Sequence, residues 1–433
     1  MPSISRGRGW LLTTAVVVPT TALVLGSAAT ASAAPVSAPE ATVVAAKYKN
    51  NGKFKVKAPN FGQHSSEVKP GTGSGSLRFT SPTWREVQPT QNGPYDWTGF
   101  DATVNKARSW GYSSNMMHAF YGTPSWAGSN VKQPLVEIPP NSRSASAPTN
   151  MDYWRDYVTA VVKRYKGKIK YYQTWNEATS PQFYQGTPKQ MATMTKILYQ
   201  VVRKYDKKAK VVSASAQTHR KSWYQAFMPK YLKALKKAKW PVNAIAGHFY
   251  PNGNGGPNQR LKQIDMFNKT LDKYKVPSKV DRMDTEVNYD LRGPGSPGAP
   301  NGRITGNKAA TYVARTFLDG WRRGLQNQYW FMWTSSYNFF PGIQMYQDSQ
   351  PGVKAYNNLV SWTKGGKFNS CSTKGKLVTC NFKKGKSFKV MFTQKGKAKV
   401  RLSGKTSVCP VSTGQCKKTK GTLKVTTLPV RVG

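Results

Sequence analysis

Short apolar runs alternate with longer segments of helical periodicity over most of the chain. The apolar runs lie near residues 60–62, 76–79, 114–119, 169–175, 210–214, 244–248, 280–285 and 328–333. Between them, apolar side chains recur at helical spacing in residues 153–165, 189–205, 223–239 and 308–323. Repeated strand–helix units build a parallel sheet, and eight of them match a (β/α)8 TIM barrel with long loops. We therefore predict an α/β fold with this barrel over residues 58–362.

The pattern changes after residue 362, where short alternating segments are separated by glycine-lysine turns. Such segments, at residues 376–380, 387–392 and 422–425, predict a small antiparallel β domain over residues 363–433. All four cysteines of the chain lie here, at Cys371, Cys380, Cys409 and Cys416. Pairing each with its nearest neighbour closes the shortest loops and would stabilise a small core. A zinc site is the alternative, but the spacing contains no Cys-x-x-Cys and no histidine is nearby.

The N-terminal residues have the pattern of an export signal. Arg6 and Arg8 precede a mostly apolar stretch over residues 10–25, and Ala31-Ser32-Ala33 follows as a small-residue cleavage site. We predict a signal peptide over residues 1–33, a linker over 34–57, and a secreted, extracellular product. A transmembrane anchor is disfavoured because the stretch is short and interrupted by Thr, Pro and Gly, and no second one follows.

Charge adds a second constraint. The chain has 66 Lys and Arg against 18 Asp and Glu, a formal net charge of +48, and residues 363–433 hold no acidic residue. We expect this domain to be attracted to an anionic polymer or cell-wall surface, although a solvated surface tuned for solubility is the alternative. Specific nucleic-acid recognition is not expected, since charge-driven binding would leave the barrel pattern unexplained.

The scarcity of carboxylates narrows the candidate chemistry. Only six residues are glutamate, and two of them, Glu177 and Glu286, follow the fourth and seventh apolar runs. In a TIM barrel the carboxyl ends of the strands share one pocket, so these two can face each other. Glycosidic cleavage requires such a pair, with one carboxyl protonated and the other ionised, about 5 to 5.5 Å apart in a retaining enzyme.

The segments around both glutamates resemble those of clan A glycoside hydrolases. Trp175-Asn176-Glu177 is similar to the clan's strand-four motif, and Asp284-Thr285-Glu286 to its strand-seven motif. The resemblance implies a retaining β-glycoside hydrolase that acts on a polysaccharide or oligosaccharide. It assigns Glu177 as acid/base, Glu286 as nucleophile and Asn176 as the ligand of the sugar 2-hydroxyl.

Further segments extend the resemblance over residues 60–362. Residues 84–89, 93–97 and 100–101, then 122–127, resemble family 39 β-xylosidase-like members, while Asp284 and the loop 293–302 depart from them and leave family 5 open. His248 and Tyr250 match a pair expected to hydrogen-bond nucleophile and substrate, and Arg78 an arginine that supports the nucleophile. The remaining candidates are His118, placed near Glu177, and the aromatic residues Trp126 and Trp333, with Trp330 as the alternative to Trp333.

Several alternatives remain at this point. Asp284, two residues before Glu286, is expected on the same barrel face, either as an alternative nucleophile or in a buried ion pair. His248 could instead be a core histidine, and the whole protein a non-catalytic cell-wall-binding protein. We predict no cofactor and no metal, because the histidines are scattered and the glycine-rich residues 71–76 lack the lysine of a phosphate loop. A monomer is expected.

Overall fold

The computed structural model describes residues 53–71, 74–129, 145–291, 302–334 and 342–433. All of the described residues belong to one compact unit. The predicted signal peptide and most of the predicted linker therefore lie outside the described residues. Within them, no helix combines the length and the apolar character needed to cross a membrane.

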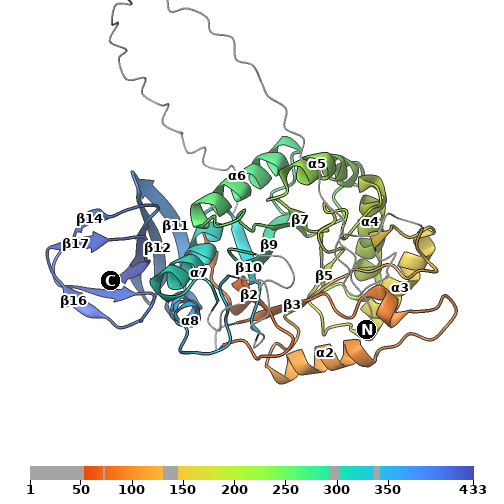
Figure 1. Ribbon diagram of the computed structural model, residues 1–433, viewed down its shortest axis with the longest axis horizontal. Helices are drawn as coiled ribbons and strands as arrows, with labels where there is room; N and C mark the ends of the chain where they lie inside the picture. The colour runs from red at the N-terminus through yellow and green to blue at the C-terminus, as the bar shows by residue number, and fades with distance from the viewer. Residues whose placement is uncertain (1–52, 72–73, 130–144, 292–301, 335–341) are drawn as a thin grey trace, which may run out of the picture. The chain divides into compact units, whose positions relative to one another are not determined.

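A closed barrel of parallel strands forms the first part of the described chain (Figure 1). Its strands are β2 (Phe61–His64), β3 (Ser76–Phe79), β4 (Met116–Ala119), β5 (Tyr171–Gln173), β6 (Lys210–Val212), β8 (Ala244–His248), β9 (Asp281–Val287) and β10 (Leu325–Trp330). Pairing of β10 with β2 and of β6 with β8 closes the ring, and the short β7 (Ala216–Gln217) also pairs with β8. The predicted eight-stranded barrel is confirmed.

Helices alternate with these strands and surround them (Figure 1). They are α1 (Trp84–Val87), α2 (Thr98–Ser109), α3 (Met151–Arg164), α4 (Pro188–Tyr205), α5 (Lys221–Lys237), α6 (Pro257–Lys273), α7 (Gly306–Trp321) and α8 (Pro351–Thr363), with a 3-10 turn at Ala58–Asn60. Local sequence sets their ends. At α4, for example, Thr187 and Gln190 form a reciprocal capping box and Pro188 occupies the first turn, where its missing N–H is not needed.

Strand alternation divides the buried side chains between two layers. Met117, Tyr171, Met283 and Tyr329 belong to a small cluster that fills the barrel interior. Larger clusters lie between the strands and the helices. Because the interior is packed by these side chains, the polar residues at the carboxyl ends of the strands are held at one rim of the barrel.

The C-terminal region is antiparallel β, as predicted. Its strands are β11 (Lys367–Lys374), β12 (Leu377–Lys384), β13 (Lys386–Thr393), β14 (Ala398–Arg401), β15 (Thr406–Pro410), β16 (Lys417–Thr419), β17 (Thr422–Val425) and β18 (Val430–Val432). β14 and β17 form a separate ribbon, and the others join one sheet. The disulfides are Cys371–Cys380 and Cys409–Cys416, which confirms the local pairing.

The described end of the predicted linker is structured. Phe54–Lys55 forms β1 and adds an antiparallel strand to β11. The Phe54 ring lies 5.4 Å from the Phe368 ring and 5.8 Å from the Trp321 ring, and Val56 is fully buried. Alternating apolar residues thus bury one side of this segment, so residues 53–57 belong to the folded unit.

Candidate active site

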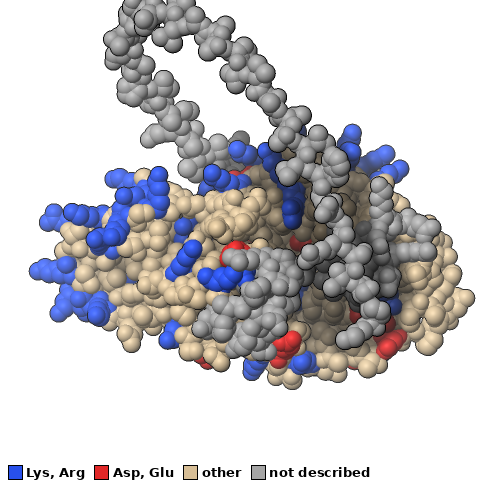
Figure 2. Space-filling model, viewed as in Figure 1, with Lys and Arg blue, Asp and Glu red and all other residues tan. Residues whose placement is uncertain are grey.

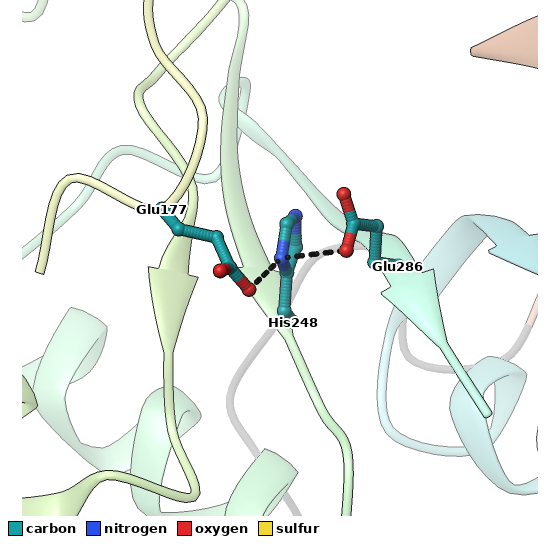
Figure 3. A group of neighbouring side chains, drawn as sticks. All are labelled: Glu177, His248 and Glu286. Carbon is teal, nitrogen blue, oxygen red and sulfur yellow. Dashed lines mark hydrogen bonds and ion pairs between the residues drawn. The ribbon is translucent and has the colours of Figure 1, made fainter. Parts of the chain in front are cut away.

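Glu177 lies just beyond β5 in an unusual backbone conformation. Its φ is +45°, in the left-handed region that costs a non-glycine residue about 1–2 kcal/mol. The backbone N–H donates to Ser215 Oγ at 2.8 Å, which helps to hold this turn. The side chain points toward β8 (Figure 3), and its relative exposure is 7 %. Backbone strain of this kind concentrates at functional sites, where surrounding contacts maintain it.

Glu286 reaches the same region from β9 because that strand contains a bulge. Gly247 of β8 pairs with Asp284 of β9, and the next residue of β8, His248, pairs with Glu286. β9 therefore has one extra residue, Thr285, between the two pairs. The extra residue interrupts the alternation of side chains between the two faces. Asp284 turns toward α6, where Arg260 Nη2 lies 2.6 Å from its Oδ2. The expectation that Asp284 and Glu286 share a face was wrong, whereas the expected buried ion pair of Asp284 is present.

His248 lies between the two glutamates (Figure 3). Its Nδ1 is 2.7 Å from Glu177 Oε1 and 3.4 Å from Glu286 Oε2, and its Nε2 is 3.0 Å from Thr285 Oγ1. One ligand atom from each of the three residues lies within 4.8 Å of the other two. The carboxylate oxygens are therefore about as close as a retaining mechanism requires.

Neighbouring side chains hold the carboxylate group of Glu286 in one orientation. Arg78 Nη1 lies 2.6 Å from Oε1, and the Tyr250 hydroxyl donates to Oε2 at 2.9 Å. Arg78 is itself held, since it donates to Gln173 Oε1 and Asn176 Oδ1, each at 2.8 Å. Burial and the neighbouring carboxylates raise the pKa of Tyr250 well above its usual value, so it remains a neutral donor.

The surroundings of Glu177 favour the protonated form instead. Burial raises the pKa of Glu177 to about 7, against the opposing effects of Arg78, a hydrogen bond from Gln217 Nε2, and Arg220. Burial also lowers the pKa of His248 to about 3, so this imidazole is neutral at neutral pH. A carboxylic acid that can donate a proton near neutrality thus faces a carboxylate paired with a guanidinium.

The elevated pKa of Glu177 predicts the alkaline limb of the pH profile. If protonated Glu177 is the acid, kcat/KM falls about tenfold per pH unit above pH 7, because the active form is lost as Glu177 ionises. The hydrogen bond from Gln217 favours the ionised form, so Gln217→Ala should move the limb to higher pH. Initial rates over a pH series measure both effects, and an unmoved limb in this variant would contradict the assignment.

Glu177, His248 and Glu286 are also the described residues whose atoms are spaced to hold a metal ion. The geometry fits a metal poorly. Both oxygens of Glu286 already accept from Arg78 and Tyr250, and those of Glu177 contact His248 and Gln217. A divalent cation would also lie beside the buried Arg78 guanidinium, which would repel it. The donor set is better matched to proton transfer.

The structure gathers most of the predicted site residues but places three elsewhere. Arg78, Asn176, His248 and Tyr250 contact one another or the two glutamates, as described above. His118 packs among phenylalanine rings, 4.5 Å from Phe100 of α2 between ring centroids, on the outer side of the barrel. Its neighbours on β4 alternate with it, so the interior position belongs to Met117.

Neither predicted tryptophan contacts the glutamates. Trp126 Nε1 donates to the Gln88 carbonyl, and its ring packs on Trp84 and Tyr153. Trp333 packs against Tyr356 of α8, at a centroid distance of 6.1 Å. The face expected for Trp333 assumed regular alternation, but β10 ends at Trp330.

Three residues near the glutamates were missed by the sequence reasoning. His64 Nε2 lies 2.8 Å from the Thr285 carbonyl and 3.5 Å from Arg78 Nη1. Gln217 of β7 donates to Glu177 Oε2. Phe331 is half-buried, with its ring 5.1 Å from that of His64 and 6.4 Å from that of Tyr250. The position of His64 at the end of the first strand was the available signal, whereas Gln217 lies in a segment without strand periodicity.

Comparison with known proteins places the fold. No model of a protein family matches the sequence, and no curated protein matches it. Among solved structures, a family 39 glycoside hydrolase from Bacteroides cellulosilyticus is similar with a TM-score of 0.63 and 15 % identity, covering 87 % of this chain and 82 % of that one. A monomeric β-xylosidase from Caulobacter crescentus is similar with a TM-score of 0.60 and 14 % identity, covering 89 % of this chain and 97 % of that one.

Other similar structures broaden this set. A family 30 endoxylanase from Clostridium papyrosolvens matches with a TM-score of 0.55 and 12 % identity, covering 88 % of this chain and 97 % of that one. Two of these neighbours are glycoside hydrolases of families 39 and 30, in agreement with the clan A resemblance. At such low identity the likeness establishes the fold alone.

Proposed function

We propose that this protein is a secreted retaining β-glycoside hydrolase that cleaves O-glycosidic bonds in a polysaccharide or oligosaccharide. One observation carries the proposal. Two buried glutamates face each other at the rim of a TIM barrel, in environments that separate their roles. Burial favours protonated Glu177, while Arg78 and Tyr250 bind the carboxylate of Glu286.

In the first step Glu286 attacks the anomeric carbon of the substrate. The bond from that carbon to the glycosidic oxygen breaks, and the oxygen leaves with the proton of Glu177. The products are a glycosyl ester on Glu286, ionised Glu177 and the released alcohol. Protonation of the leaving group is the role that a carboxyl group with a pKa of about 7 can serve at neutral pH.

In the second step ionised Glu177 accepts a proton from water, and the resulting hydroxide equivalent attacks the anomeric carbon. The ester bond to Glu286 breaks, which restores its carboxylate and leaves the sugar with its original configuration. His248 supports both steps. Its Nδ1 can accept from protonated Glu177 or donate to ionised Glu177, and the Thr285 hydroxyl can follow the change of tautomer at Nε2.

Two further residues are suited to bind the sugar. Asn176 Oδ1 accepts a hydrogen bond from Arg78, so Asn176 would bind the sugar through its amide N–H groups. This agrees with the proposed hydrogen bond from Asn176 to the sugar 2-hydroxyl. Phe331 presents a half-exposed ring beside His64 and Tyr250, and pyranose rings pack their apolar C–H faces on aromatic rings. We assign Phe331 the stacking role first expected of Trp333.

The neighbours suggest the class of substrate. The structural neighbours include a β-xylosidase, an endoxylanase, a glucosidase and an endoglucanase. Aryl xylosides and glucosides, together with the corresponding β-linked polymers, are therefore the first substrates to examine. The predicted signal sequence in residues 1–33 supports an extracellular site of action.

The test is the configuration of the first sugar released. We expect the purified protein to hydrolyse aryl β-glycosides, and the proton NMR spectrum to show the β anomer before mutarotation. Initial release of the α anomer would contradict double displacement by Glu286. Absence of hydrolysis across xylosides, glucosides and their polymers would favour the non-catalytic alternative.

A further inference from the structure

Part of the positive charge of the C-terminal domain lies on the face of its sheet opposite the packing face. Strands β11–β13 turn Phe368, Val378, Phe382 and Phe388 toward the barrel, where they join the same buried cluster as Trp321 of α7. Side chains alternate along a strand, so the opposite face of this sheet carries Lys367, Lys383 and Lys389, all exposed. We call these three residues the outer lysine face.

Like charges are placed directly against each other in this domain. Lys367 lies opposite Lys383 across β11 and β12, Lys384 opposite Lys386 across β12 and β13, and Lys399 opposite Lys424 across β14 and β17. Like charges in directly opposite positions destabilise an antiparallel pair. Residues 363–433 contain 18 Lys and Arg and no Asp or Glu, so no acidic side chain within the domain offsets this repulsion.

The distribution differs from that of the barrel. There, arginines pair with acidic residues, as Arg260 does with Asp284, Arg315 with Asp319 and Arg323 with Asp265. Over the C-terminal strands, Figure 2 shows blue side chains without red ones among them. A positive field that the fold does not neutralise attracts polyanions over a range of about 10 Å at moderate salt.

The side chains also restrict the type of polyanion. The phenylalanines of this domain, Phe368, Phe382, Phe388 and Phe392, are buried, so none of them provides a stacking surface for nucleic-acid bases. The basic residues are mostly lysines, which act as point charges and do not require the bidentate geometry that arginine offers to phosphates. These features fit a polymer with repeated, spaced negative groups.

We propose that the outer lysine face and the Lys399–Lys424 pair bind an anionic polysaccharide, one that carries carboxylate, sulfate or phosphodiester groups along its chain. The choice of a glycan rests on the proposed function, because the domain belongs to the same compact unit as the glycosidase-like barrel. Binding would hold the barrel on its polymer and replace lysine–lysine repulsion with contacts to the ligand.

The test compares two variants with equal loss of charge. One carries Lys367→Gln, Lys383→Gln and Lys389→Gln; the control carries Lys233→Gln, Lys236→Gln and Lys237→Gln on exposed positions of α5. Both are made in a Glu286→Gln background, so that binding is measured whether or not the protein hydrolyses glycans. Affinities for polygalacturonate, a sulfated glycan and a phosphomannan, whose sugars are joined through phosphodiesters, are recorded over a salt series and distinguish the three anionic groups.

We expect the outer-face variant to bind at least one of these polymers about tenfold or more weakly at ~0.1 M salt. In this variant the plot of log affinity against log salt concentration should become less steep by roughly two units, because three charged contacts are lost. The α5 control should keep the affinity of its parent. Equal weakening of both variants would show a non-specific charge effect and would overturn the proposal. The proposal would also be overturned if the protein bound duplex DNA or anionic vesicles as tightly as it binds each of the glycans.

A single charge reversal separates binding from folding. Lys383→Glu places a carboxylate opposite Lys367 and should leave the unfolding temperature unchanged or higher, while binding weakens. Lower stability together with weaker binding in this variant would indicate that the lysines serve the fold, and would overturn the proposal. Failure of hydrolysis with binding intact would count against the glycosidase alone.

Discussion

Glu286→Ala should lose activity toward aryl β-glycosides by a factor on the order of 10⁴ or more, since no other described carboxylate can take its place. Asp284, the other acidic residue of the motif, is paired with Arg260 on the opposite face of β9. Azide should enter the space left by the side chain and attack the anomeric carbon from the same side. The expected product is an α-glycosyl azide, identified by NMR.

The companion variant reports on the other glutamate. Glu177→Ala retains the nucleophile, so substrates with a good leaving group should still form the glycosyl ester, and azide should then give the β-glycosyl azide. Asp284→Asn is the control and should give no azide product, because its role is an ion pair. Azide products of one configuration from both glutamate variants would contradict the assignment of separate roles.

Arg78→Met should destabilise the protein by about 3–5 kcal/mol, because it leaves the Glu286 carboxylate buried without its ion-pair partner. The Arg78 side chain is fully buried and also donates to Gln173 and Asn176, so two amide oxygens lose a partner as well. Urea denaturation of the wild type and of the variant measures the difference in free energy of unfolding.

A double-mutant cycle separates the ion pair from the packing of Arg78. Arg78→Met combined with Glu286→Gln removes both charges, so the combined loss of stability should be smaller than the sum of the two single losses. The difference measures the coupling between the two side chains. Simple addition of the two losses would show that Arg78 stabilises the protein without its contact to Glu286.

Much of the fold could be predicted from local sequence. Apolar runs with strand periodicity identified every strand of the barrel sheet except the two-residue β7, and β8 was predicted with its observed bounds, 244–248. The cysteines could be paired correctly because the two members of each pair are close in the sequence and lie opposite each other across a hairpin or turn. The linker boundary failed at β1, whose burial depends on Trp321 and Phe368, far away in the sequence.

The candidate site was predicted less completely. Glu177 and Glu286 were identified because they follow strands, and all parallel strands of a barrel end at one rim. His118 and Trp333 were misplaced since the face of a side chain depends on where its strand begins, ends or bulges. Gln217 was missed because β7 is formed by pairing with β8, and its two residues have no periodicity of their own.

By itself, the sequence determined the barrel, the basic β domain, the local disulfides and the two glutamates, because each follows from periodicity, composition or short spacing. Only the tertiary structure decided the environments of those glutamates. The bulge in β9 directs Glu286 to Arg78 and Asp284 to Arg260, and burial beside β8 raises the pKa of Glu177. These environments arise from contacts between residues far apart in the chain, and such contacts exist only once the barrel has closed.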